Sequence, residues 1–339
     1  MAGSVQLYSI IIHPTTIKFR GGAQYPAKPS PANLTNEEKE AFHRDGFILK
    51  KGLFQGDELK DLIAAGERLY SSWRFLDFAF KNSFAKLVLQ VWREDERFAQ
   101  VAFESCFPSI AAELLGVTVH ENEISSSSDT ESIRILKDGF FGFKGKNNTG
   151  CGFHVDDKGF WPASDDSTGV NFWLALSPMR MSEGGGIRVA NQSISESFRE
   201  ECAAVIRGGY GTTCKMEELS PDCHERLQAA SATFDMEPGD ALIWDRWTFH
   251  RSEPFRVETD QHKLRYTIRY VPGSAKAEGM LHSSQQAGEP FEGAYYPQVW
   301  PAAVKAEVDA IADGLEADLS FSKTYMLKSF ARRLVSRFL

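Results

Sequence analysis

Three residues of metal-binding type are spaced as if they belonged to one site. His154 and Asp156 lie two positions apart in the segment 152–156, and side chains at that spacing share one face of an extended strand. A third candidate, His250, comes much later in the chain. Two histidines and one carboxylate on one triangular face of a metal leave three positions open, as in non-haem Fe(II) sites that react with O₂. The sequence therefore predicts that these three residues bind one Fe(II) ion.

The same donor types allow another interpretation. Histidine and aspartate also bind Zn²⁺, so a zinc hydrolase with a metal-bound water would use the same three residues. Metal analysis of anaerobically purified protein separates the two possibilities.

Short β-strands are the elements that must position these residues. From about residue 132 to residue 271, runs rich in β-branched and aromatic residues alternate with Gly, Pro, Asn and Asp, which is typical of strands and turns. So many strands with few helices between them favour antiparallel pairing in a jelly roll or barrel. The predicted strands are 132–136, 139–144, 151–156, 169–177, 186–190, 232–236, 241–244, 248–251 and 263–271.

Helices are expected on both sides of this region. Thr35 is a good N-cap, and Glu38 completes a capping box at the start of the first helix. A short strand at 47–49 follows it. Apolar residues recur at helical spacing from 55 to about 104. The other predicted helices are 107–115, 195–207, a weaker 219–229, 301–315 and a basic amphipathic 322–339.

These elements predict an α+β chain with a mainly β core. We expect an N-terminal arm over 1–33 and a single domain over 34–339. That domain would have a helical part at 34–117, a jelly-roll core at 118–273, and C-terminal loops and helices at 274–339.

Composition narrows the possible partners and the location. The chain has 339 residues, is 42% hydrophobic, and has a formal net charge of -8, which argues weakly against nucleic-acid binding. No apolar stretch is long enough to cross a bilayer, and no targeting segment is convincing. The five cysteines form no CxxC pair, so we expect reduced thiols, a packed thiol at Cys151 and a cytoplasmic protein.

Several sequence blocks, taken in order, resemble one family of enzymes. They are His154-Val155-Asp156, Asn171-Phe172-Trp173-Leu174-Ala175-Leu176, Ser182-Glu183-Gly184-Gly185-Gly186-Ile187-Arg188-Val189, Pro238-Gly239-Asp240 with His250-Arg251-Ser252, and Arg265-Tyr266-Thr267-Ile268-Arg269-Tyr270. Together with the segment 34–47, they resemble the phytanoyl-CoA dioxygenase family of Fe(II)- and 2-oxoglutarate-dependent oxygenases. The resemblance implies a double-stranded β-helix, also called a jelly roll or cupin-like fold. It also implies Fe(II), the cosubstrate 2-oxoglutarate, and O₂.

The resemblance also implies roles for individual residues. His154, Asp156 and His250 would be the iron ligands. Arg265 is the best match to the arginine that pairs with the distal carboxylate of 2-oxoglutarate, with Arg269 and Arg256 as alternatives. A guanidinium suits that task because it binds a carboxylate with two parallel hydrogen bonds. Thr267, two residues further along the same strand face, offers a hydroxyl donor for the same carboxylate. The other cosubstrate contacts that the resemblance implies are Trp173 and Lys144.

The reaction is predicted only in outline. The family would oxidise an unactivated C–H bond, by hydroxylation or by oxidative ring closure or desaturation, with release of succinate and CO₂. The carboxylate of Asp156 argues against halogenation, because relatives that halogenate carry a small residue there.

The expected substrate is a small, anionic metabolite. Predicted substrate contacts are Arg269, Phe153, Trp161 and Arg188, although core packing is the other interpretation of the two aromatic residues. An acyl-CoA substrate and a jelly-roll binding module without turnover are the alternatives. The anionic substrate is suggested by basic residues near the predicted metal strands: Lys144, Lys146, Arg188, Arg246, Arg251 and Arg269.

Overall fold

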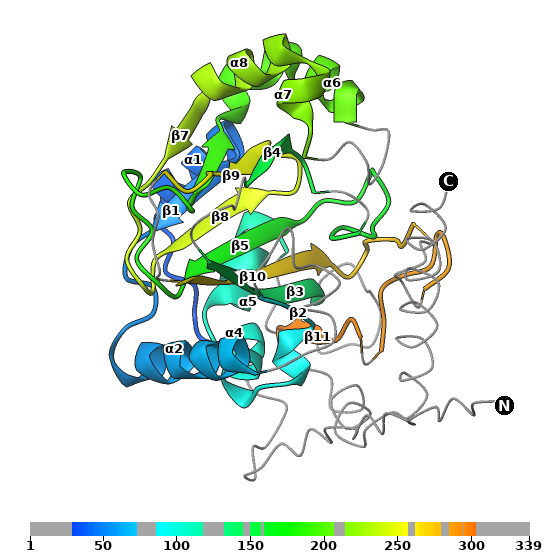
Figure 1. Ribbon diagram of the computed structural model, residues 1–339. Helices are drawn as coiled ribbons and strands as arrows, with labels where there is room; N and C mark the ends of the chain where they lie inside the picture. The colour runs from blue at the N-terminus through cyan, green and yellow to red at the C-terminus, as the bar shows by residue number, and fades with distance from the viewer. Residues whose placement is uncertain are drawn as a thin grey trace, which may run out of the picture.

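Two antiparallel β-sheets form the centre of the structure (Figure 1). The computed structural model describes residues 29–72, 86–117, 132–144, 150–156, 159–206, 214–256, 262–278, 285–293 and 295–302. Within these residues the larger sheet has seven strands, in the order β1 (Phe47–Lys50), β8 (Ala241–Asp245), β5 (Val170–Ala175), β10 (His262–Pro272), β3 (Ile133–Lys144) and β11 (Gln298–Trp300), with β2 (Lys86–Leu89) also paired to β3. The smaller sheet has four, in the order β4 (Cys151–His154), β9 (His250–Ser252), β6 (Ile187–Ala190) and β7 (Ser231–Thr233).

From β3 to β10 the chain passes back and forth between the two sheets, and each strand belongs to one of them. Along the chain, β3, β5, β8 and β10 enter the larger sheet, while β4, β6, β7 and β9 enter the smaller one. This is the double-stranded β-helix, and the predicted fold class is confirmed. Every strand pairing in both sheets is antiparallel.

Strand β10 shows how the sequence encodes a sheet that is covered on both faces. Tyr266, Ile268 and their alternate neighbours pack into the main core beneath the larger sheet. Arg265, Thr267 and Arg269 point to the other face, between the two sheets, and all three are buried. Alternation of side chains along a strand requires this separation. Strand β10 is buried and alternates apolar with polar or cationic residues. This pattern indicates a polar site inside the protein.

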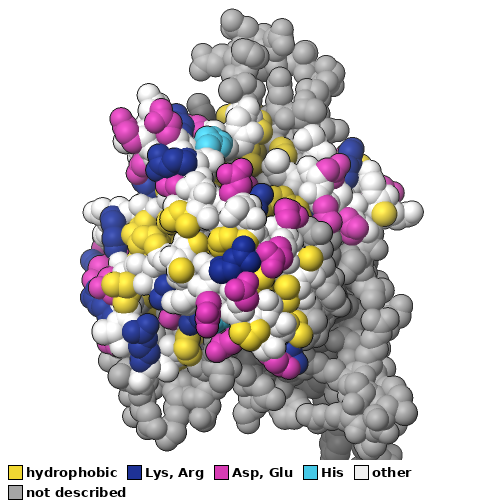
Figure 2. Space-filling view, turned by 90° about the horizontal axis from the view of Figure 1, so that it is seen from above, with side chains coloured by type: hydrophobic (Ala, Val, Ile, Leu, Met, Phe, Trp, Pro, Cys, Tyr) yellow, Lys and Arg dark blue, Asp and Glu magenta, His cyan; other side chains and the backbone are white. Residues whose placement is uncertain are grey.

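Helices cover the outer face of each sheet (Figure 1). Against the larger sheet pack α1 (Asn36–Asp45), α2 (Gly56–Ser71), the 3₁₀ turn η1 (Val91–Arg93), α4 (Glu96–Phe103) and α5 (Phe107–Leu114). The predicted capping box of α1 is present. Over the smaller sheet lie α6 (Gln192–Ile206), α7 (Met216–Leu219) and α8 (Pro221–Ala229). Acidic, basic and apolar side chains are interspersed on the face seen in Figure 2. Among the described residues, no helix has the length and apolarity needed to span a membrane.

One predicted helix is partly wrong. Residues 86–89, expected to be helical, form strand β2 and pair with Gly139–Gly142 of β3. Leu87 packs with Phe141 and Phe143, whereas Val88 packs into the main core on the other side. This two-residue alternation is the property of a strand, and pairing with β3 overrides the helical spacing. The predicted helices after residue 302, and residues 1–28 of the predicted arm, lie outside the described residues.

The expectation of reduced thiols is wrong for four of the five cysteines. Cys151 is bonded to Cys214, and Cys202 is bonded to Cys223, with Cα–Cα distances of 4.7 and 5.5 Å. The paired cysteines are 63 and 21 residues apart in the sequence, so local motifs such as CxxC do not reveal them. Cysteine usage therefore gives no support to a cytoplasmic location.

The disulfides give a direct chemical prediction. Protein purified and denatured without reductant should show one reactive thiol, that of Cys106, because the other four cysteines are paired. After reduction, five thiols should react. Titration with a thiol reagent measures both values, and five reactive thiols before reduction would contradict the pairing.

Asp138 is a buried acid beneath the larger sheet. Its Oδ2 accepts hydrogen bonds from the Trp92 backbone N–H and the Tyr266 hydroxyl, both at 3.0 Å, while Oδ1 has no partner within the described part of the chain. Burial raises the pKa of Asp138 to about 7, and the two hydrogen bonds only partly oppose this effect. The carboxyl is therefore protonated in the folded chain at pH values where it ionises in the unfolded chain.

This raised pKa predicts a pH-dependent stability. The folded state binds the extra proton between the unfolded pKa, about 4, and the folded pKa, so the free energy of unfolding falls as the pH rises through that window. Between pH 5 and pH 7 the wild type should lose about 2 kcal/mol relative to Asp138→Asn, because the slope of about 1.4 kcal/mol per pH unit halves as the pH reaches the folded pKa. Urea unfolding of both proteins across this range tests it, and parallel pH profiles would contradict it.

Candidate metal centre

Pairing of β4 with β9 brings the two candidate histidines together. In this register His154 lies directly opposite His250, after an irregularity between Cys151 and His154. Directly opposed residues on antiparallel strands share a face. The ring centroids of the two imidazoles are accordingly 4.3 Å apart. Two residues almost a hundred positions apart in sequence thus become neighbours on the inner face of the smaller sheet.

Each imidazole is oriented by a backbone carbonyl. His154 Nδ1 lies 2.7 Å from the Gly152 carbonyl oxygen, and His250 Nδ1 lies 3.1 Å from the Thr248 carbonyl oxygen. A ring nitrogen that donates to a carbonyl leaves the other nitrogen, Nε2, with a lone pair for a metal. Burial, and next the neighbouring His154, lower the pKa of His250 to about 3. His250 is therefore neutral, as a metal ligand must be.

Asp156 completes the group from just beyond the end of β4. Its Oδ1 lies 3.7 Å from His250 Nε2, and its side chain is 5% exposed. Burial alone would raise the pKa of Asp156, but the positive charge of Arg269 and its hydrogen bond outweigh burial and hold the pKa below its usual value. One ligand atom from each of the three residues lies within 4.8 Å of the others.

This donor set fits Fe(II). Two imidazole nitrogens and one carboxylate oxygen converge, and no fourth His, Cys, Asp or Glu joins them among the described residues. Three protein ligands on one side leave room for a chelating cosubstrate and O₂ on the other. The structure thus brings together all three residues predicted to bind the metal.

A second group of predicted residues lies on the facing, larger sheet. Arg265 and Thr267 of β10 and Trp173 of β5 are buried on its inner face. The Arg265 guanidinium lies 4.3 Å from the ring centroid of Phe143 and 5.5 Å from that of Trp173. Burial, and next the charge of Arg269, lower the pKa of Arg265 to about 9. No carboxylate pairs with Arg265 among the described residues.

Buried polar atoms in this group lack partners. Arg265 Nε, Thr267 Oγ1 and Trp173 Nε1 are all shielded from solvent and make no hydrogen bond in the described part of the chain. A buried donor without an acceptor is costly and calls for a ligand or a water. An anionic ligand that accepts several hydrogen bonds fits this cluster, and 2-oxoglutarate is such a ligand.

Other predicted contacts do not join this group. Phe153 packs against the helices outside the smaller sheet. Trp161 packs beside the end of β10 with residues of the C-terminal segment. Arg188 lies opposite Arg251 on the outer face of the smaller sheet and bonds Glu253 at 2.8 Å. Lys144 ends β3, and its side chain lies outside the described residues.

The structure adds residues that the sequence reasoning did not assign. Asn171 lies opposite both Arg269 and Trp244 on the inner face of the larger sheet, and neither of its amide atoms has a hydrogen-bond partner among the described residues. The Phe160 ring lies 5.0 Å from the Arg269 guanidinium. Asn171 could have been found, because it precedes Trp173 by two positions and so shares its face.

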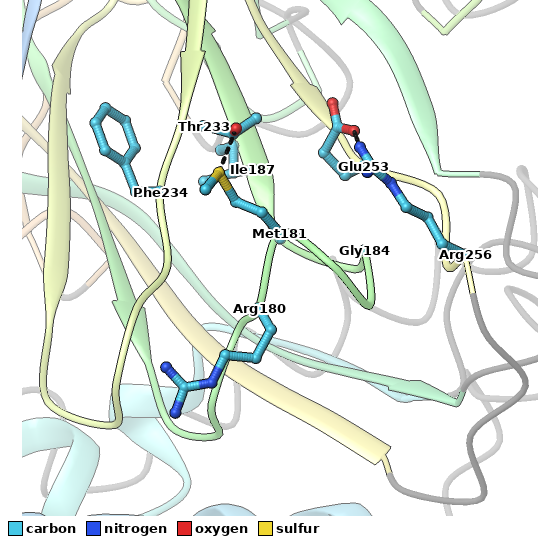
Figure 3. A pocket seen from close by; sticks show the side chains of 9 residues that line it. Arg180, Met181, Gly184, Ile187, Thr233, Phe234, Glu253 and Arg256 are labelled. Atoms are coloured by element: carbon cyan, nitrogen blue, oxygen red, sulfur yellow. Dashed lines mark hydrogen bonds and ion pairs between the residues drawn. The ribbon is translucent and has the colours of Figure 1, made fainter.

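A surface pocket lies near the end of β9 (Figure 3). It is lined by Arg180, Met181, Gly184, Gly186, Ile187, Thr233, Phe234, Glu253 and Arg256. Glu253 at its edge is shared by Arg188, Arg251 and Arg256. None of the three candidate metal ligands lines this pocket.

The double-stranded β-helix and its His-Asp-His group define the class of cupin-fold metal-dependent oxygenases. Solved structures of that fold are similar to the chain. The carbocyclase SnoK from nogalamycin biosynthesis matches with a TM-score of 0.59 at 17% identity, over 80% of this chain and 100% of that one. The epimerase SnoN, solved with Fe³⁺, α-ketoglutarate and nogalamycin RO, matches with 0.56 at 16%, over 78% and 97%. EctD from S. alaskensis, solved with 2-oxoglutarate and 5-hydroxyectoine, matches with 0.51 at 17%, over 76% and 87%.

The family model for phytanoyl-CoA dioxygenase (PhyH) matches residues 42–262, and the chain belongs to that family. It is therefore an Fe(II)- and 2-oxoglutarate-dependent dioxygenase. A search of curated proteins found no match.

Removal of Asp156 should abolish metal binding at this site. Asp156→Ala leaves two imidazoles without their anionic partner, so Fe(II) bound per chain should fall at least tenfold at micromolar metal. Anaerobic reconstitution followed by metal analysis measures it. Arg188→Ala, which removes a charge on the outer face of the same sheet, serves as the control. Unchanged iron content in Asp156→Ala would remove Asp156 from the ligand set.

Proposed function

We propose that His154, Asp156 and His250 hold the Fe(II) of this enzyme and that Arg265 binds 2-oxoglutarate. In this proposal the enzyme oxidises a C–H bond of a small molecule and releases succinate and CO₂. The convergence of the three ligand atoms within 4.8 Å carries the proposal.

Arg265, rather than Arg269, is proposed as the cosubstrate clamp. Arg269 already bonds Asp156, whereas Arg265 has no carboxylate partner among the described residues. Thr267, the next residue along the same strand face, offers a hydroxyl that has no partner in the described segments. A guanidinium and a hydroxyl on one face can together bind the distal carboxylate of 2-oxoglutarate.

The protein's own contribution is binding, orientation and exclusion of water. When bound, Fe(II) and 2-oxoglutarate supply the oxidising chemistry, with O₂ as the oxidant. The Gly152 and Thr248 carbonyls orient the two imidazoles so that each Nε2 would be free to bind the metal. The rings of Phe141, Phe143 and Trp173 surround the Arg265 guanidinium and keep water from it. A buried carboxylate–guanidinium contact is stronger there than in water.

The substrate is proposed as a small molecule without a fixed charge. Most cations that suggested an anionic substrate already have protein partners. Arg188 and Arg251 bond Glu253, and Arg269 bonds Asp156. Arg246 donates to the carbonyls of residues 163, 164 and 167. Neutral compounds therefore enter a substrate screen beside the small acids and the acyl-CoA thioesters.

The reaction type is open to hydroxylation, ring closure and desaturation. Similar folds include proteins described as a carbocyclase and an epimerase, so the fold does not select one outcome. A screen that follows succinate formation and O₂ uptake, with product mass as a third readout, separates these reactions. A protein that consumes no 2-oxoglutarate with any compound, or without one, would support a binding module instead.

Substitution of Arg265 tests the cosubstrate assignment. Arg265→Gln should raise the KM for 2-oxoglutarate about 10- to 100-fold, because a charge-assisted hydrogen-bond pair contributes about 1.5–3 kcal/mol. Succinate formation at varied 2-oxoglutarate measures it, with Arg188→Gln as the matched control. An unchanged KM in Arg265→Gln would reject the clamp.

A further inference from the structure

We propose that Arg269 is a positioning residue that holds Asp156 so that only one carboxylate oxygen faces the metal. This inference rests on the proposed function, because it takes Asp156 as an iron ligand. It gives Arg269 a different role from the substrate or cosubstrate contact that its place on β10 suggests.

The contact between the two side chains is specific to one oxygen. Arg269 Nε donates to Asp156 Oδ2 at 2.8 Å, and Arg269 Nη2 lies 2.8 Å from the same atom. The other oxygen, Oδ1, is the one that faces His250 Nε2. With Oδ2 occupied by a guanidinium, Asp156 offers the metal Oδ1 alone. A carboxylate that bound through both oxygens would occupy a position that 2-oxoglutarate or O₂ needs.

The place of Arg269 in the sheet keeps this contact fixed. Its side chain is 7% exposed and lies on the inner face between Lys137 of β3 and Asn171 of β5. The pairing of β10 with β3 shifts register immediately after Arg269. Such irregularities re-aim a side chain and are common beside active sites. The Phe160 ring covers the guanidinium at 5.0 Å.

The ion pair between Arg269 and Asp156 also decides which arginine remains available to the cosubstrate. Arg265 and Arg269 share one face of β10, and two free guanidinium groups would both attract an anionic ligand. Asp156 neutralises Arg269, so the positive charge available to 2-oxoglutarate is that of Arg265. Arg265 then binds the cosubstrate while Arg269 binds Asp156, so the two acids do not compete for one arginine.

The test compares Arg269→Gln and Arg269→Lys with the wild type. Anaerobic calorimetric titration gives the affinity for Fe(II) without cosubstrate, and a second titration gives the 2-oxoglutarate affinity of the metal-saturated protein. Arg269→Gln should weaken Fe(II) binding about 10- to 100-fold, the usual effect of losing a partner that orients a metal ligand. Its 2-oxoglutarate affinity should fall as well, because a released Oδ2 can take a metal position that the cosubstrate needs. Arg269→Lys, which keeps one cationic donor, should recover part of the metal affinity.

The Co(II)-substituted protein supplies a readout independent of affinity. Release of Oδ2 should change the coordination number, so the visible ligand-field spectrum of Arg269→Gln should differ from that of the wild type, and Arg269→Lys should lie between them. The matched control is Arg265→Lys, which should weaken 2-oxoglutarate binding and leave Fe(II) affinity unchanged. Thermal unfolding of the metal-free proteins checks folding, and Arg269→Lys carries the test if Arg269→Gln does not fold.

The outcomes separate the inference from the proposed function. Wild-type Fe(II) affinity and spectrum in the Arg269 variants, with weakened 2-oxoglutarate binding, would make Arg269 the clamp and overturn the inference. Unchanged metal and cosubstrate binding with a raised KM for the substrate would also overturn it, by making Arg269 a substrate contact. A wild-type protein that binds neither Fe(II) nor 2-oxoglutarate would instead reject the proposed function itself.

Discussion

The register between β4 and β9 is the constraint on which the candidate site depends. These short strands place His154 opposite His250, and the chain that leaves β4 carries Asp156 back toward the same point. A slip of one residue would turn a histidine to the outer face, because side chains alternate along a strand. The helices α6 to α8 pack on that outer face, and the disulfide from Cys151 ties β4 to the chain before α7. Both features oppose such a slip.

The larger sheet contributes the charges that the smaller sheet lacks. Its inner face presents Arg265, Thr267 and Arg269 from one strand, across from Trp173 and Asn171 of the next. Burying two guanidinium groups is unfavourable unless each finds a partner. Asp156 is the partner of one, and the other is left for an anionic ligand. This polar interior fits a bound acid beside a metal, as expected of a chain that belongs to the phytanoyl-CoA dioxygenase family.

Much of this arrangement could be predicted from the sequence, because side chains alternate between the two faces of a strand. The same alternation explains why several predicted contacts were wrong. This alternation puts His154 and Asp156 on the inner side of the smaller sheet. It also requires Phe153, which lies between Gly152 and His154, to point to the outer face. Arg188 precedes Val189, which lies opposite His250, so Arg188 must face outward too. Strand β2 was missed because four residues carry too little pattern to outweigh helical spacing. The disulfides were missed because the paired cysteines lie far apart in the sequence. They come together only when the chain folds, and their spacing gives no sign of it.

The central claim is that one metal ion lies between His154, Asp156 and His250 with its cosubstrate on the side of Arg265. Anomalous diffraction at the iron absorption edge, from crystals grown anaerobically with Fe(II) and 2-oxoglutarate, tests it most directly. The account predicts a single strong peak in contact with Nε2 of both histidines and Oδ1 of Asp156, with the distal carboxylate of 2-oxoglutarate on Arg265. A peak elsewhere, or a cosubstrate whose distal carboxylate contacts Arg269 in place of Asp156, would contradict it.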